Sequence, residues 1–217
     1  MPRNNDIPVY LVAGFLDSGK TDFINSVLSD GFAAREPTLL ICCEEGENGY
    51  DKKFLRNVTV VTVEEQEELT CSKCKEWEKL CHPTQILIEY NGMWLLDKLY
   101  TALPEGWMVY QEFFFADANT ILLYNDNMRQ LVYDKLKSCE LVVFNRFTPA
   151  MDKMEFHKIV RGASRRADIA YEAPNGDVVY DDIEDPLPFD VNAPIVTIED
   201  EDYALFYRDL GDAMPEY

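Results

Sequence analysis

Residues 14–21 read Gly14-Phe15-Leu16-Asp17-Ser18-Gly19-Lys20-Thr21, which fits the pattern G-x-x-x-x-G-K-[ST]. Glycines let the backbone curl so that successive N–H groups point toward bound phosphates. The Lys20 ammonium can reach the β- and γ-phosphates, and the Thr21 hydroxyl can bind Mg²⁺. An apolar run precedes the motif and an amphipathic stretch follows it, as this loop requires. The predicted phosphate-binding loop, or P-loop, has as its nucleotide contacts Gly14, Asp17, Ser18, Gly19, Lys20, Thr21 and Asp22.

Short apolar runs alternate with amphipathic stretches along most of the chain. We expect buried strands at residues 9–13, 38–43, 58–63, 85–89, 109–115 and 141–145. We expect helices at residues 20–28, 93–103, 120–136 and 153–163. This alternation implies right-handed crossovers and a mostly parallel sheet with helices on both faces. The sequence therefore predicts an α/β fold of the P-loop NTPase type, whose ligands bind at the carboxyl ends of the strands.

The composition narrows the classes of partner and compartment. The chain has 217 residues with 20 basic and 40 acidic side chains, so its formal net charge is −20. That charge argues against nucleic acid and anionic membranes as partners. The apolar run at residues 9–13 is too short for a signal peptide or a membrane span. We therefore expect a cytoplasmic protein without membrane insertion, whose six cysteines stay reduced.

The character of the chain changes from Pro174 onward. Asn175-Gly176 is a hairpin signal between short apolar runs at residues 169–171 and 178–180. A proline-rich connection, a strand at residues 195–198 and a short helix from residue 203 are expected after it. Because acidic residues crowd this part, we divide the chain into a P-loop domain, residues 1–173, and an irregular acidic C-terminal extension, residues 174–217.

Two further segments follow predicted strands, at the same edge of the sheet as the P-loop. Residues 44–51 form an acidic loop with two glycines, which either contacts Mg²⁺ or is a solvated turn. Glu89 ends an apolar strand, and Gly92 follows three residues later. In a P-loop fold a carboxylate at such a strand end holds Mg²⁺, and a nearby glycine N–H senses the γ-phosphate. We expect these two roles for Glu89 and Gly92.

A third segment carries thiols. Cys71-Ser72-Lys73-Cys74 has the spacing of soft-metal ligands, and Cys81-His82 follows closely. Cys71, Cys74, Cys81 and His82 together could enclose a tetrahedral Zn²⁺ or another transition metal. A redox pair and plain surface thiols are the alternatives, because the second C-x-x-C of a zinc ribbon is missing.

In order and spacing these segments resemble the CobW-type GTPases, which are related to the nickel-insertion GTPases of urease and hydrogenase. The resemblance runs over residues 8–173. The P-loop, with Ile7-Pro8-Val9 before it, is similar to the family's I-P-V and G-F-L-G-A-G-K-T. The acidic loop resembles N-E-F-G-E-V-G-I-D, Glu89-Tyr90-Asn91-Gly92 resembles E-T-S-G, and Ala116-Asp117-Ala118 resembles V-D-A.

The resemblance implies that the acidic loop is a nucleotide-sensing switch. Glu44 and Asp51 then join Thr21 and Glu89 at Mg²⁺, and Glu45 and Glu47 are the candidates for positioning the attacking water. It further implies slow hydrolysis of GTP that is coupled to metal handling or metallocofactor delivery. A metalloprotein or metal transporter would be the client, and a nucleotide-dependent homodimer is expected.

Three departures from the family bear on the choice of ligand. Its metal motif is C-x-C-C, so the ligand set does not carry over to this chain, and the Cys42-Cys43 pair is a further candidate. Asp17 replaces a glycine and Asp22 a threonine, which adds negative charge near the phosphates. Asn145-Arg146-Phe147-Thr148 stands where GTPases place N-K-x-D. Thr148 cannot accept two hydrogen bonds from the guanine edge, so the sequence leaves GTP and ATP both open.

Two alternatives to a metal-handling GTPase follow from these departures. One is a degenerate nucleotide-binding or scaffold module without turnover. The other is an ATP-preferring P-loop protein, including a small-molecule kinase. The kinase is the weaker of these, because few arginines that could clamp a transferring phosphoryl group follow Lys158.

Overall fold

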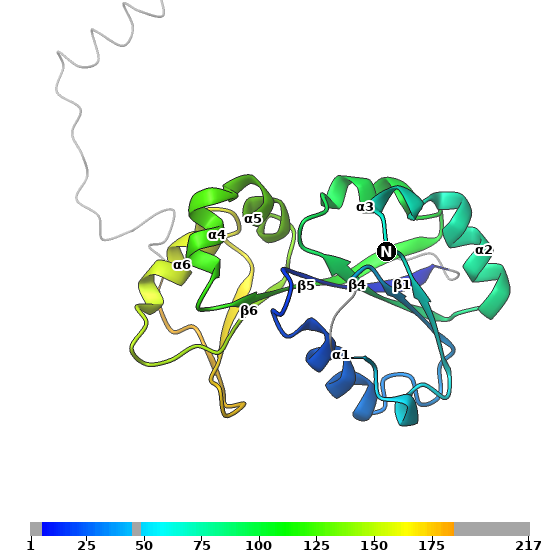
Figure 1. Cartoon of the computed structure of the whole chain (residues 1–217), viewed down its shortest axis with the longest axis horizontal. Coiled ribbons are helices and arrows are strands. Elements are labelled where there is room, and N and C mark those ends of the chain that lie inside the picture. Colours follow the sequence, from blue (N-terminus) through cyan, green and yellow to red (C-terminus); the bar gives the residue numbers. More distant parts are fainter. Residues whose placement is uncertain (1–5, 45–48, 185–217) are drawn as a thin grey trace, which may run out of the picture. The chain divides into compact units, whose positions relative to one another are not determined.

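The computed structural model describes residues 6–44 and 49–184. This part of the chain forms one sheet of eight strands, in the order β3-β2-β4-β1-β5-β6-β7-β8 (Figure 1). The strands are β1 (Ile7–Gly14), β2 (Thr38–Cys42), β3 (Val58–Thr62), β4 (Gln85–Asn91), β5 (Trp107–Asp117), β6 (Leu141–Asn145), β7 (Asp168–Glu172) and β8 (Val178–Tyr180). The six strands expected before residue 150 are all present.

The first seven strands in this order, from β3 at the edge to β7, pair in parallel with their neighbours. β1 lies between β4 and β5, with Val9 opposite Ile86 and Val109. Most successive parallel strands are connected by α-helices, as crossover units require, whereas the described part of the β2–β3 connection contains the 3-10 helix Lys52–Phe54. The carboxyl ends of these strands therefore share one edge of the sheet, where Gly14 and Asn91 are partners.

The last two strands form the expected hairpin. β8 pairs antiparallel with β7, and Tyr171 lies opposite Val179. Gly176 in the turn has a φ of 86°, a left-handed conformation that glycine adopts without steric cost. The hairpin is part of the same compact unit as the other strands, and that unit ends at Ile183. The strand and helix expected at residues 195–198 and from residue 203 lie outside the described residues.

Helices cover the two faces of the sheet unequally. On one face α1 (Lys20–Ser29) packs Ile24 and Leu28 against Val12. The opposite face, to which Leu11 points, carries the remaining helices. They are α2 (Cys71–Cys81), α3 (Leu96–Ala102), α4 (Ile121–Asn127), α5 (Arg129–Leu136) and α6 (Lys153–Arg161). Figure 1 shows α1 on one side of the sheet and these helices on the other. The predicted α/β fold is thus confirmed.

Three elements differ from the expectation. Helix α2 was not predicted because its sequence is mostly polar and its apolar stripe is narrow: only Cys74 is fully buried, and Trp77 and Cys81 are partly buried against the core. The helix expected at residues 120–136 is two helices, because Met128 between them has a φ of −133°. β3 is an edge strand with partly exposed residues rather than one buried on both faces. No helix within residues 6–44 and 49–184 is long and apolar enough to cross a membrane.

Candidate functional site

The P-loop connects the end of β1 to the start of α1 at the carboxyl edge of the sheet. Gly19 precedes the helix with a φ of 89°, and a Cβ at this position would collide with Nδ2 of Asn145. Only glycine fits both the conformation and the close approach. The first N–H groups of α1 have no acceptor within the helix, so they are available to an anion.

Lys20 is buried at the P-loop, with 2% of its surface exposed. Its Nζ donates to the Phe15 carbonyl over 2.7 Å and pairs with Glu44 Oε2 at 2.5 Å. Burial raises the pKa of Glu44, although the Lys20 charge opposes that shift. The expected phosphate-binding lysine therefore meets the acidic loop, and Glu44 contacts Lys20 directly.

Thr21 and Glu89 are brought together as predicted. The Thr21 hydroxyl donates to Glu89 Oε1 over 2.7 Å, and Glu89 is buried with 2% exposed. The other carboxylate oxygen, Oε2, accepts from the Tyr50 hydroxyl. Burial raises the pKa of Tyr50 far above its ordinary value, and the Glu89 charge adds to this. A hydroxyl and a carboxylate beside the P-loop lysine are the oxygen ligands that Mg²⁺ prefers.

Gly92 lies against the backbone of the P-loop. A Cβ on Gly92 would come within 2.6 Å of the Gly14 carbonyl oxygen and 2.7 Å of the Phe15 nitrogen. Any larger residue would displace the loop, since both neighbours are backbone atoms. Gly92 therefore lies against the P-loop, and its contact with the γ-phosphate stays a prediction.

The segment after Gly92 is held by two buried charges on α5. Lys135 Nζ donates to the Trp94 carbonyl over 2.6 Å, and Asp134 Oδ2 accepts from the Leu96 N–H at 2.9 Å. The two side chains pair with each other at 2.8 Å. Although burial alone would raise it, the pKa of Asp134 is lowered, because Lys135, the Leu96 N–H and other donors stabilise its charge. This support was not predicted from the sequence.

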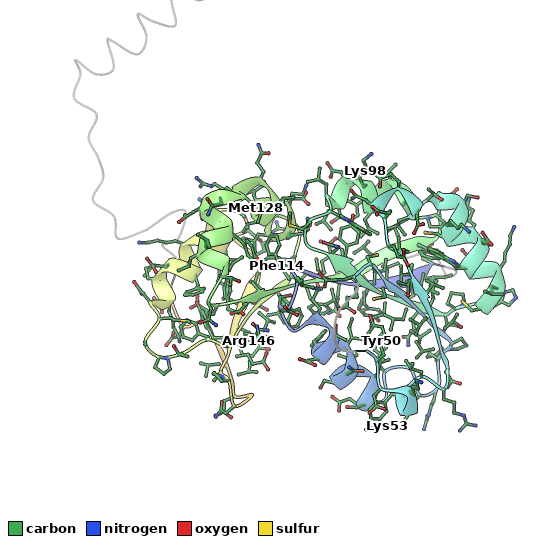
Figure 2. All side chains as sticks on the ribbon, viewed as in Figure 1. Tyr50, Lys53, Lys98, Phe114, Met128 and Arg146 are labelled. Atoms are coloured by element: carbon green, nitrogen blue, oxygen red, sulfur yellow. The ribbon has the colours of Figure 1, made fainter. Side chains whose placement is uncertain are left out.

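On the other flank of the P-loop, β6 ends at Asn145, and Arg146 follows the strand. Asn145 Nδ2 donates to the Ser18 carbonyl over 2.5 Å. Arg146 Nη1 donates to the Asp17 carbonyl at 2.8 Å and pairs with Asp117 at 2.6 Å. Asp17 has a φ of 57°, a left-handed conformation in which aspartate is enriched. Figure 2 shows Tyr50 and Arg146 on either side of α1.

A cavity of about 610 Å³ adjoins this flank, within the range of about 300–1,000 Å³ typical of small-molecule sites. It lies between the first turns of α1, the end of β6 and the β7–β8 hairpin. Its lining includes Gly19, Asp22, Asn145, Arg146, Glu172 and Tyr180. Thr148 is not among the described residues that line this cavity.

Asp51, one of the expected Mg²⁺ ligands, pairs with another residue instead. The Asp51 carboxylate accepts from the Lys53 N–H at 3.1 Å and pairs with the Lys53 ammonium at 2.7 Å, so the structure does not bring it to Thr21 and Glu89. It caps the short 3-10 helix Lys52–Phe54 instead. Glu45 and Glu47 lie outside the described residues.

The predicted zinc ligands do not come together. Cys71 begins α2, whereas Cys81 ends it and His82 follows as its cap. At a rise of about 1.5 Å per residue, the two ends of this helix lie roughly 15 Å apart. Cys74 is buried in the core, and burial raises its pKa to about 12. Among the described residues no group of three or more histidine, cysteine or acidic side chains could hold a metal ion.

Tyr50 is the main site residue that the sequence interpretation missed. It lies in the acidic loop, one position before Asp51, and its hydroxyl occupies one oxygen of the expected Mg²⁺ ligand Glu89. A tyrosine among acidic and glycine residues was the available signal, because an aromatic ring in a polar loop needs a partner to pack against. Phe54 and Leu55, which follow it, pack in the same cluster as Tyr50.

Comparisons with known proteins identify the family to which this fold belongs. The search of curated proteins returned no match. A solved structure, the crystal structure of the hydrogenase maturation factor HypB from Archaeoglobus fulgidus, is similar in fold, with a TM-score of 0.52 and 13% identity over 79% of this chain and 83% of that one. The family model described as CobW/HypB/UreG, nucleotide-binding domain, matches residues 8–170. The chain therefore belongs to the CobW/HypB/UreG family of nucleotide-binding domains.

Proposed function

We propose that this chain binds a nucleoside triphosphate together with Mg²⁺, that the nucleotide is GTP, and that slow hydrolysis is coupled to metal handling. The observation that carries the proposal is the contact of the Thr21 hydroxyl with Glu89 at 2.7 Å, next to a lysine buried at the P-loop. A buried carboxylate, a hydroxyl and a lysine at a helix N-terminus are the groups that a Mg²⁺-bound triphosphate requires.

The residues present fit this ligand. Thr21 and Glu89 would hold Mg²⁺, which neutralises negative charge on the phosphates when it is bound. The Ser18 hydroxyl is buried and has no hydrogen-bond partner within the described residues, so a phosphate oxygen would satisfy it. Lys20 would exchange Glu44 for the β- and γ-phosphate oxygens, because a phosphate carries more negative charge than a carboxylate.

Hydrolysis requires that the chain orient a water in line with the γ-phosphate. Lys20 would stabilise the charge that develops during this attack, and the Gly92 N–H would contact the γ-phosphate. Glu45 and Glu47 remain our candidates for positioning the water, since they belong to the same loop as Glu44. Release of phosphate would free Lys20 to pair with Glu44 again, which gives the loop two states.

Coupling to metal handling is supported by the family and by the position of the thiols. Cys42 ends β2 and donates to the Glu44 carbonyl over 3.0 Å, so a thiol adjoins the proposed switch. Cys43 and Cys74 are in the same core cluster, too buried to bind metal without rearrangement. We propose that a transition metal binds in a nucleotide-dependent state, with a metalloprotein or metal transporter as the client and a second copy of the chain as a partner.

A second candidate function is nucleotide binding without turnover. It is favoured by the Asp51 carboxylate, which faces Lys53 rather than Thr21, and by the substitution of threonine for aspartate at residue 148. Lys20-dependent release of inorganic phosphate would decide for the GTPase. Binding of nucleotide without such release would decide for the module without turnover.

Calorimetric titration with Mg²⁺ and non-hydrolysable GTP or ATP analogues tests the proposal. We expect wild-type protein to bind the GTP analogue and Lys20→Ala to weaken binding at least about 100-fold, or about 2.7 kcal/mol. Lys79→Ala is the matched control, because that lysine is an exposed residue of α2. Equal affinities of wild type and Lys20→Ala would contradict the proposal.

A further inference from the structure

The cavity beside Asn145 is where the base of a bound nucleotide would lie, since it adjoins the P-loop at Gly19. Thr148, at the position of the base-reading aspartate in GTPases, does not line this cavity within the described residues, whereas Glu172 does. From this we infer that the Glu172 carboxylate reads the base and selects guanine over adenine. The inference rests on the proposed nucleotide binding.

Strand register sets Glu172 beside Asn145. Val143 lies opposite Ala170 in the parallel pair of β6 and β7, and the same offset places Asn145 opposite Glu172. Val143 and Ala170 both pack on the α1 face of the sheet. Because side chains alternate along a strand, Asn145 and Glu172 point to that face as well, on strands about 4.8 Å apart. The Phe147 N–H donates to the Glu172 carbonyl at 2.9 Å, which fixes the end of β7.

Both residues leave acceptor oxygens without donors. Asn145 is buried, and its Oδ1 has no hydrogen-bond partner among residues 6–44 and 49–184, while its Nδ2 is committed to the Ser18 carbonyl. In the same part of the chain no group donates to the Glu172 carboxylate. Buried polar atoms are normally hydrogen-bonded, so the Asn145 Oδ1 marks a place for a donor, and the half-buried Glu172 carboxylate is a second acceptor beside it. A ligand that supplies N–H groups would complement this pair.

Guanine has the matching pattern of donors. Its N1–H and its amino group are adjacent donors, and a carboxylate accepts two parallel hydrogen bonds. Adenine presents N1 as an acceptor at the same edge, so its lone pair would face a carboxylate oxygen. The carboxylate therefore both attracts guanine and rejects adenine, as selective sites commonly do.

The remaining lining suits a flat aromatic base. Phe23 on α1 and Tyr180 on β8 supply aromatic rings, and Val143 and Ala170 supply apolar surface on the sheet. Bases stack on aromatic side chains irrespective of their identity. The apolar walls would thus hold any purine, and the discrimination would come from Glu172.

The test is calorimetric titration of the full chain with the Mg²⁺ complexes of non-hydrolysable GTP, ATP and XTP analogues. In Glu172→Gln the amide oxygen can accept from N1–H of xanthine and the amide N–H can donate to its O2. We expect this variant to lose roughly 10- to 100-fold in GTP affinity and to bind XTP more tightly than wild type does. Asp168→Asn, an exposed change at the other end of β7, should leave all affinities unchanged.

A structural role for Glu172 would weaken all three nucleotides together, and that result would overturn the inference. Glu172→Ala gives a second readout, because without either acceptor the affinities for GTP and ATP should converge. If the ratio of GTP to XTP affinity were the same in Glu172→Gln as in the wild type, Glu172 would not be the residue that reads the base. A preference of the wild type for ATP would refute the inference in the same way. Neither result would contradict nucleotide binding itself. Failure of the wild type to bind any of the three would refute the proposed function as well.

Discussion

The two flanks of the P-loop are built in opposite ways. On the phosphate side, which we define as Glu44, Tyr50 and Glu89, charged and polar groups are already paired: Glu44 with Lys20, and Glu89 with Thr21 and Tyr50. On the base side, which we define as Asn145 and Glu172, the buried Asn145 Oδ1 has no hydrogen-bond partner within the described part of the chain. The half-buried Glu172 carboxylate lines the adjoining cavity.

From this difference we infer how a ligand would gain binding free energy at each flank. A phosphate or Mg²⁺ on the phosphate side must displace contacts that the protein makes with itself, so its net gain is a difference between two sets of interactions. A base on the base side would add hydrogen bonds without breaking any. Substitutions on the phosphate side should therefore change stability as well as affinity, whereas substitutions of Glu172 should change the affinity for one base relative to another.

The largest expected effect concerns the buried pair behind the phosphate side. Asp134→Ala leaves Lys135 buried without its carboxylate partner and removes the acceptor of the Leu96 N–H. Breaking a buried ion pair in this way costs about 3–5 kcal/mol of unfolding free energy. Urea unfolding monitored by circular dichroism would measure the loss.

Glu76→Ala is the control for this change. Its pair with Lys73 is exposed, and such surface pairs contribute about 0–1 kcal/mol. If both variants lost the same small amount, the segment from Trp94 to Leu96 would not depend on α5, and the phosphate side would be less tightly supported than the contacts indicate.

An intermediate effect is expected at the glycine that touches the P-loop. Gly92→Ala places a Cβ within 2.6 Å of the Gly14 carbonyl oxygen, so we expect a loss of about 1–3 kcal/mol in stability, as for overpacking, together with weaker nucleotide binding. Gly49→Ala is the control for stability, because a Cβ there meets nothing within 4 Å. Thermal unfolding of both variants would show whether the close approach at Gly92 destabilises the protein, and titration of Gly92→Ala against wild type would measure the change in nucleotide affinity.

The smallest expected effect concerns Glu44, which competes with the phosphates for Lys20. Glu44→Gln removes the negative charge that holds Lys20, so the phosphates meet less competition, and Mg²⁺-nucleotide affinity should rise by about 3- to 10-fold, at most about 1.4 kcal/mol. Glu155→Gln, an exposed change on α6, serves as the control in the same titration. A marked fall in affinity would instead assign Glu44 to Mg²⁺, as the family resemblance implies.

Local features of this protein could be predicted well from the sequence. The P-loop, the buried strands and the hairpin at Asn175-Gly176 depend on short patterns of apolar residues and glycines, which act within a few positions. Helix α2 was missed because its apolar stripe is narrow, with only Cys74 fully buried and Trp77 and Cys81 partly buried. The expected zinc site was wrong for a related reason, since that unpredicted helix separates Cys71 from Cys81 and His82.

What the sequence established is therefore the list of chemical groups and the order in which they occur: a lysine and a threonine at a helix start, a carboxylate at a strand end, and no aspartate at residue 148. Which groups meet was decided by the sheet. Tyr50 reaches Glu89 across 39 positions, and Glu172 comes beside Asn145 through the register of β6 and β7. Such pairings depend on strand order and on contacts between distant segments, and short-range patterns do not encode either of these.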